Sequence, residues 1–233
     1  MTTAIMQPYL LPYLGYWQLI DSVDIFVIYD DAQYLKGGWI NRNRIIVNGH
    51  DRLFSLPIAK APVTARINER RFAEPFLERR RSLLDLFANS YRHAPYFKDI
   101  FPCLEETFSN DKTNVATFLE HQIRRVCQLI GIRTLIVSAS SINISSGTSG
   151  AARVIALAKA IGGTQYVNAI GGKVLYSKDH FLAAGIDLRF LRVGELNYDQ
   201  SDTDWIPHLS IVDVLMNCGV DETKKLLIKK VIE

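Results

Sequence analysis

The segment from residue 3 to residue 29 constrains the fold more than any other part of the chain. Ala4-Ile5-Met6 is a short apolar run that ends at Gln7-Pro8, which is typical of a buried strand. Residues 14–22 carry apolar side chains at helical spacing, and residues 25–29 (IFVIY) are apolar throughout, as in a central parallel strand. Strand, loop, helix and strand in this order predict a βαβ unit of a nucleotide-binding α/β fold.

The remainder of the chain predicts a second part of the same sheet, separated from the first by helices. Residues 45–58 predict a hairpin with its turn at Asn48-Gly49. Helical spacing of apolar residues predicts helices over 74–91, 97–108 and 115–130. Strands are expected at 134–137, 165–167 and 188–191, and helices at 149–161, 179–184, 208–216 and 221–232. We therefore expect one α/β domain over residues 1–233, a Rossmann-like parallel sheet with halves 1–60 and 130–233, split by a helical insertion at about 70–130.

Charge and composition limit the classes of partner. The net charge is +3, and acids are interleaved with the basic residues. A nucleic-acid interface usually has a stronger, one-sided basic excess, so no nucleic-acid partner is expected. A modest positive field suits a small anionic ligand such as a nucleotide sugar. No run of about 18 apolar residues occurs, so no membrane span is expected.

The cysteines predict no metal site and no disulfide framework. Cys103, Cys127 and Cys218 are far apart, odd in number and not at metal-ligand spacing. The N-terminus lacks a basic region followed by an apolar one, so no signal peptide is expected. Reduced thiols in a compact domain fit the cytoplasm.

The loop after the first predicted strand is the first candidate binding segment. Residues 7–18 read QPYLLPYLGYWQ, and ligands of α/β folds lie outside the carboxyl ends of the strands. Tyrosines offer ring faces for a base or sugar and hydroxyls for hydrogen bonds. The candidates are Gln7, Tyr9, Tyr13 and Tyr16; the alternative is a stiff loop whose aromatic rings simply pack.

The second candidate segment follows the strand at 25–29. Asp30 and Asp31 are costly if buried without partners, and they suit a general base or a metal ligand. Gln33 follows them as a candidate binding residue. The alternative is an acidic turn neutralised by nearby arginines.

The third candidate segment, residues 38–44 (GWINRNR), alternates arginine with asparagine. An extended segment would place Arg42 and Arg44 on one face, where paired guanidinium groups suit a pyrophosphate. Trp39 can stack on a ring, and Asn41 is a further candidate. The alternative, compatible with the first, is that both arginines neutralise Asp30 and Asp31.

Two later segments give weaker signals. Asn168, Gly171 and Gly172 follow a predicted strand, where backbone N–H groups can face an anion, although an ordinary loop is the alternative. His208 precedes a predicted helix close to Ser210 and is a candidate catalytic residue, with helix capping or packing as the alternative.

These motifs resemble the WbqC-like family. The resemblance rests on residues 7–9 (QPY), 12–16 (PYLGY), 29–34 (YDDAQY), 38–44 (GWINRNR), 94–97 (APYF), 168–172 (NAIGG) and 209–216 (LSIVDVLM). It spans essentially the whole chain. The family pattern often has an aromatic residue where this chain has His208, which weakens a catalytic role for that histidine.

The family resemblance implies work on a nucleotide-linked amino sugar in bacterial O-antigen, lipopolysaccharide or other surface-glycan biosynthesis. The proposed reaction is N-acyl or N-aminoacyl transfer, for example of a glycyl group, to the sugar amine. The donor is open: an acyl thioester, including one on an acyl carrier protein, or a system using ATP and magnesium. The sequence identifies no cofactor beyond these donor systems, and an oligomer is compatible with it.

A more distant likeness is to the fold of nucleotidylyltransferases. Their H-x-G-H motif would correspond to Tyr13-Leu14-Gly15-Tyr16, in which both histidines are replaced by tyrosine. An enzyme of that type using ATP is therefore the second hypothesis. A non-catalytic module that binds a nucleotide sugar or a carrier protein is the third.

Overall fold

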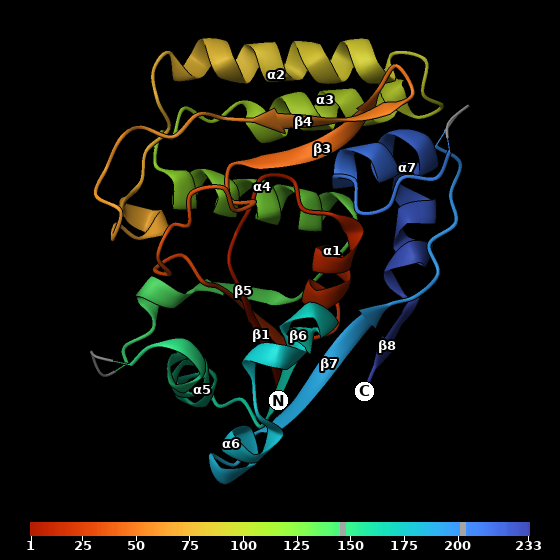
Figure 1. Ribbon diagram of the computed structural model, residues 1–233. Helices are drawn as coiled ribbons and strands as arrows, with labels where there is room; N and C mark the ends of the chain where they lie inside the picture. The colour runs from red at the N-terminus through yellow and green to blue at the C-terminus, as the bar shows by residue number, and fades with distance from the viewer. Residues whose placement is uncertain (145–147, 201–203) are drawn as a thin grey trace.

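Six strands form the central sheet of the computed structural model, which describes residues 1–144, 148–200 and 204–233. The sheet order is β5-β2-β1-β6-β7-β8, and β8 alone among its strands is antiparallel to its neighbour (Figure 1). The strands are β1 (Thr2–Met6), β2 (Ile25–Ile28), β5 (Leu135–Ser138), β6 (Gln165–Ala169), β7 (Asp187–Val193) and β8 (Lys230–Ile232). If these six strands are numbered 1 to 6 in the order of the sequence, their order across the sheet is 3-2-1-4-5-6, as in the Rossmann fold. The predicted fold class is confirmed.

The predicted βαβ unit is present at the N-terminus. Helix α1 (Leu14–Ile20) connects β1 to β2, and Ala4 pairs with Phe26 in parallel register. Successive residues of a strand face opposite sides of the sheet. Phe26 accordingly packs into the larger hydrophobic core and Val27 into the smaller one on the other face. Burial on both faces explains why this strand has no polar positions.

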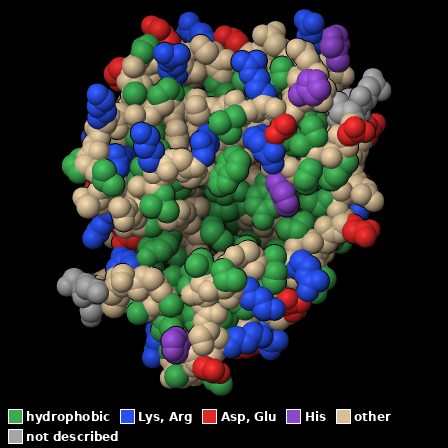
Figure 2. Space-filling model, viewed as in Figure 1, with side chains coloured by type: hydrophobic (Ala, Val, Ile, Leu, Met, Phe, Trp, Pro, Cys, Tyr) green, Lys and Arg blue, Asp and Glu red, His purple; other side chains and the backbone are tan. Residues whose placement is uncertain are grey.

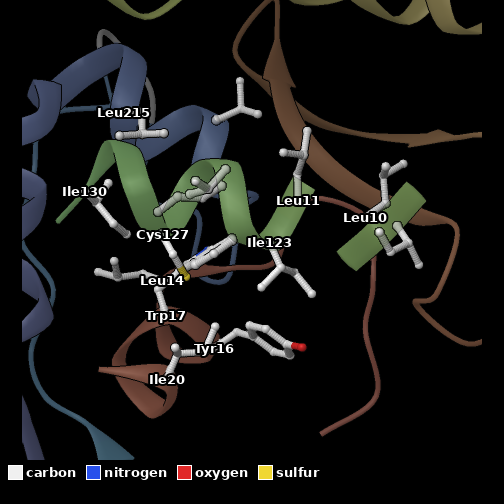
Figure 3. Close-up of a cluster of buried hydrophobic side chains, with 14 of the residues drawn as sticks. Leu10, Leu11, Leu14, Tyr16, Trp17, Ile20, Ile123, Cys127, Ile130 and Leu215 are labelled. Carbon is white, nitrogen blue, oxygen red and sulfur yellow. The ribbon is translucent and has the colours of Figure 1, made fainter. Parts of the chain in front are cut away.

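The larger core joins the sheet to the insertion between β2 and β5. The inserted helices are α2 (Phe76–Tyr91), α3 (Phe97–Phe108) and α4 (Val115–Leu129). Figure 3 shows Ile123 and Cys127 of α4 directed toward Leu14 and Trp17 of α1. Trp17 is fully buried there, so α4 closes one face of the sheet.

The hairpin belongs to the insertion rather than to the sheet. Strands β3 (Arg42–Val47) and β4 (His50–Ser55) form a separate antiparallel pair that lies beside α2 and α3 in Figure 1. The predicted turn at Asn48-Gly49 is confirmed, with φ values of 51° and 80°. The inserted part therefore begins well before residue 70, because Phe54 packs on Phe87 of α2 with ring centroids 5.1 Å apart.

The opposite face of the sheet is covered by α5 (Gly150–Ala160) and α6 (Lys178–Ala183). Short 3₁₀ helices lie at Ile67–Glu69 (η1), Ala139–Ser141 (η2) and Ile170–Leu175 (η3). Tyr166 stacks on Phe181 of α6 in this smaller core, with ring centroids 5.3 Å apart.

The C-terminal segment differs from its prediction. Helix α7 spans Ile211–Leu227 with a non-helical Gly219, and the prediction of helix through residue 232 was wrong. Lys230–Ile232 instead forms β8, because it pairs with Leu191–Val193 of the exposed edge of β7. Nowhere in the described parts of the chain is a helix long and apolar enough to cross a membrane.

Candidate functional site

Two adjoining cavities lie where strands of the parallel sheet end. The first, of about 970 Å³, is lined by residues from the carboxyl ends of β1, β2 and β5 and from the start of α5; we call it the carboxyl-end cavity. The second, of about 560 Å³, lies between the loop after β1 and the segment 35–44; we call it the aromatic cavity. Gln7 and Leu35 line both. Figure 2 shows the face of the molecule hollowed at its centre, with hydrophobic side chains gathered around the hollow.

Asp31 and Arg153 form an ion pair in the carboxyl-end cavity. Arg153 of α5 donates to Asp31 Oδ2, and the two side chains are 17% and 5% exposed. Asp31 Oδ1 is buried and has no hydrogen-bond partner among the described residues. One carboxylate oxygen is thus held in place by Arg153, while the other is buried with its acceptor capacity unused.

The start of α5 adds anion-binding groups to the same cavity. Ser149, at the N-cap, makes no capping hydrogen bond, so N–H groups of the first turn lack an acceptor from that side chain. Thr148, Ser149 and Gly150 all line the cavity beside Arg153. A helix N-terminus next to a guanidinium group is suited to a phosphate.

The Asp30 carboxylate is held by hydrogen bonds from two other segments. Its carboxylate accepts hydrogen bonds from the Ser140 backbone N (2.9 Å), the Ser140 hydroxyl and Asn68 Nδ2 (3.3 Å). These bonds tie the end of β2 to the loop after β5 and to η1. Asp30 lines neither of the two cavities. The prediction that Arg42 and Arg44 neutralise the aspartates was wrong, because Arg44 pairs with Asp51 and Arg42 donates to Gly37 O. Asp31 is instead neutralised by Arg153.

Aromatic rings and one histidine form the second cavity. Tyr9, Tyr13, Trp39 and His208 line it together with Arg44. The Tyr13 and His208 rings meet edge to face with centroids 5.4 Å apart. Tyr9 Oη accepts a hydrogen bond from the Tyr13 backbone N at 3.2 Å. Burial raises the pKa of both tyrosines, so both hydroxyls stay protonated donors at neutral pH.

Asn43 holds the loop that carries these tyrosines. Its Nδ2 donates to the carbonyls of Leu10 (3.1 Å) and Leu11 (2.7 Å), and the Ser210 hydroxyl also donates to Leu11 O at 2.8 Å. Leu11 has a φ of 45°, which few non-glycine residues adopt. Three carbonyl contacts from distant segments therefore fix a strained loop, and the loop orients Tyr9 and Tyr13.

The two arginines predicted to grip one pyrophosphate lie in different cavities. Arg44 lines the aromatic cavity, pairs with Asp51 (2.7 Å) and donates to Pro207 O (3.2 Å). Arg42 donates to Gly37 O and lies over the Trp39 ring with its Cζ 5.6 Å from the centroid. Both side chains extend from the same face of β3. Residues of the segment 35–40 line both cavities and lie between the two arginines.

The other predicted residues are scattered. Gln33 lines the carboxyl-end cavity and donates to Val63 O at 3.2 Å. Asn41 donates to Leu56 O (2.8 Å) and accepts from Tyr34 Oη (3.0 Å), outside both cavities. Tyr16 is 3% exposed in the core, and its hydroxyl has no partner among the described residues.

Asn168, Gly171 and Gly172 lie at the end of β6, where η3 begins, and they line neither cavity. The close approach at Gly172 is to Asn168 itself: a Cβ built on Gly172 would lie 2.2 Å from Asn168 Nδ2.

His208 has a φ of 60° and is exposed at the cavity rim. The expected capping role falls to Ser210, whose hydroxyl accepts from the Val212 N at 3.3 Å.

Sequence reasoning missed Arg153 and the hydroxyls beside it. The available signal was Thr148-Ser149-Gly150, small polar residues between a strand and a helix whose first turn carries Arg153. Asn43 was also missed as a positioning residue, because its partners lie 32 and 33 residues away. No group of three or more metal-ligating side chains occurs within the residues that the structure describes.

The parallel sheet, with helices on both faces and cavities at its carboxyl edge, defines a Rossmann-like α/β protein. The chain belongs to the WbqC-like protein family, whose model matches residues 7–225. A similar protein is the uncharacterised protein Rv1507c of Mycobacterium tuberculosis, which is 26% identical over 230 residues, or 94% of each chain. No solved structure matches the chain significantly.

Proposed function

We propose that the chain is a transferase that moves an acyl or aminoacyl group onto the amine of a nucleotide-linked sugar. The observation that carries the proposal is the adjacency of the two cavities. A phosphate-binding end built on Arg153 and the start of α5 continues, past Gln7 and Leu35, into a pocket of aromatic rings. A nucleotide sugar has the same two parts, a pyrophosphate and flat or apolar ring faces.

The phosphates are assigned to the carboxyl-end cavity. Arg153 lies beside the hydroxyls of Thr148 and Ser149, and all three residues line the cavity. The base is assigned to the aromatic cavity, where Tyr13 and Trp39 offer ring faces, and the amino sugar to the carboxyl-end cavity, which Asp31 lines. This division replaces the predicted clamp of Arg42 with Arg44.

Asp31 is the proposed general base. Its free Oδ1 accepts a proton from the sugar amine as the nitrogen attacks the carbonyl carbon of an acyl thioester. The C–N bond forms, the C–S bond breaks, and the proton passes on to the departing thiolate. His208 lines the aromatic cavity and not the carboxyl-end cavity, so no step of this reaction is assigned to it.

Binding is tested first, by calorimetry and thermal shift with UDP- and dTDP-linked amino sugars, the free nucleotides and coenzyme A esters. A ligand at a hundred times its Kd stabilises the fold by about 2.7 kcal/mol, which a melting curve resolves. We expect the amino-sugar conjugates to bind more tightly than the free nucleotides. Incubation of the best conjugate with acyl thioesters should then give a product whose added mass equals the acyl group.

A matched pair of variants locates the binding. Trp39 and Trp205 are 48% and 45% exposed, and Trp39 alone of the two lines the aromatic cavity. Trp39→Ala should weaken conjugate binding about 3- to 10-fold, whereas Trp205→Ala should leave it unchanged. Equal effects of both variants, or no binding of any nucleotide sugar to the wild type, would overturn the assignment.

A further inference from the structure

A third cavity, of about 760 Å³, lies on the other side of the segment 35–40 and is lined by four basic side chains. It opens between the hairpin β3–β4 and the segment 57–63. The basic residues are Lys36, Arg42, Lys60 and Arg70, and no aspartate or glutamate lines the cavity. We call it the basic cavity.

Arg70 is the most informative of the four. It is 6% exposed, and its Nε has no hydrogen-bond partner among the described residues. Its other nitrogens donate to Ala61 O (3.3 Å) and Pro62 O (2.7 Å), and its Cζ lies 4.8 Å from the centroid of the Tyr34 ring. No described carboxylate pairs with it. A buried guanidinium group without a counter-ion is costly, and an anion bound beside Arg70 would lower that cost.

The neighbouring cations lack counter-ions in the same way. Arg42 Nε is buried and unpartnered, and within the described residues none of the four basic side chains forms an ion pair. Leu53 and Ile58 line the cavity beside them, which provides apolar walls. Four positive charges next to an apolar wall match a multiply charged anion that carries an organic body.

We propose that the basic cavity is a second anion site, distinct from the carboxyl-end cavity, that binds the phosphate groups of an organic phosphate. Arg42 and Arg70 present planar guanidinium groups that can each make paired bonds to phosphate oxygens. Lys36 and Lys60 are both exposed and add positive charge, and their ammonium groups do not require a particular orientation of the phosphate. None of the residues of the basic cavity lines the other two cavities, so this proposal does not depend on the proposed transferase activity.

The first test uses inorganic pyrophosphate as the probe and isothermal titration calorimetry as the measurement. Lys36→Ala/Lys60→Ala removes two exposed charges at the cavity and should lower pyrophosphate affinity about tenfold. Arg79→Ala/Arg81→Ala removes two exposed charges from α2, outside the cavity, and should change the affinity less than about twofold. Both variants have the same net charge, so equal losses would mean a non-specific field and would overturn the site.

Two further arms separate this site from the proposed phosphate site at Arg153. Arg153→Gln should retain the pyrophosphate-binding event that the double lysine variant weakens about tenfold. Loss of binding in Arg153→Gln, with unchanged binding in the double lysine variant, would refute the basic cavity. In the unaltered protein, pyrophosphate should protect Lys36 and Lys60 from acetylation while exposed Lys98 stays reactive. Equal labelling of all three lysines would also refute it. ADP and coenzyme A then show which organic body strengthens binding over pyrophosphate alone.

Discussion

The Asp31 carboxylate has one oxygen held by Arg153 and one oxygen without a described partner. Asp31→Asn preserves the shape and removes the charge and the proton-accepting capacity. Turnover of an amino-sugar conjugate should fall about 10²- to 10⁴-fold if Asp31 is the general base. Conjugate affinity should hold or rise, because Arg153 loses its internal counter-ion. Steady-state kinetics with calorimetry distinguish the two effects, and unchanged turnover would remove Asp31 from the reaction.

The same substitution has a stability cost that must be measured alongside. Breaking a mostly buried ion pair from one side leaves the other charge uncompensated. Urea unfolding should show a loss of about 1–3 kcal/mol for Asp31→Asn. Kinetics are therefore compared at a temperature where both proteins are fully folded.

Asp213 predicts a pH dependence of stability. It is buried and accepts from Tyr91 Oη and Tyr198 Oη, both at 2.8 Å. Burial raises the pKa of Asp213 above 3.8, although the two hydroxyl donors lower it in part. The folded state thus binds the proton more tightly than the unfolded state. The contribution of this group is full below pH 3.8 and is lost as pH rises through the raised pKa.

The measurement is urea unfolding of wild type and Asp213→Asn between about pH 4 and about pH 7. The stability of the wild type relative to the variant should fall as pH rises. Asp24→Asn is the control of opposite sign, because hydrogen bonds from Thr2 lower the pKa of Asp24. The stability of the wild type relative to that variant should rise as pH rises toward 3.8 and should change little above it, so the control series is extended below about pH 4. A pH-independent difference for Asp213→Asn would contradict the raised pKa.

At the scale of elements, η3 is positioned by the contact between Gly172 and Asn168. A Cβ on Gly172 would lie 2.2 Å from Asn168 Nδ2 and 3.1 Å from its Cγ, and Asn168 is 5% exposed, so its side chain would have to shift within a packed region. A Cβ on Gly171 would meet nothing within 4 Å. Gly172→Ala should therefore cost about 1–2 kcal/mol in the free energy of unfolding, and Gly171→Ala close to nothing. Equal urea midpoints for the two variants would show that this contact does not position η3.

At the scale of the whole molecule, one core holds the insertion to the sheet. Phe87 of α2 and Trp17 of α1 are both fully buried in it. Phe87→Ala should cost about 3–5 kcal/mol and should lower the unfolding midpoint of the sheet as much as that of the insertion.

Trp17 fluorescence, isolated by replacing Trp39 and Trp205 with Phe, reports on the sheet side of this core. The transition should coincide with that from far-UV circular dichroism before and after Phe87→Ala. Two separated transitions would show instead that the insertion unfolds as a unit of its own.

Local pattern was sufficient for much of the architecture. The uninterrupted apolar run 25–29 predicted a strand buried on both faces, and Asn48-Gly49 predicted the hairpin turn; both are present. These features depend on neighbours within a few residues, so they can be found without the fold. The edge strand Lys230–Ile232 could not be predicted in this way. Its three residues are extended because they pair with β7, which is distant in the sequence.

In the candidate site, too, some features follow from the local sequence and others depend on the tertiary structure. The sequence by itself determined which loops carry polar and aromatic groups, since these follow the strands directly. Only the tertiary structure brought Arg153 to Asp31 across 122 residues, assigned Asp30 to Ser140, and separated Arg42 from Arg44. The physical reason is that a charge takes its partner from whatever the packed elements place beside it, and spacing along the chain does not encode that placement.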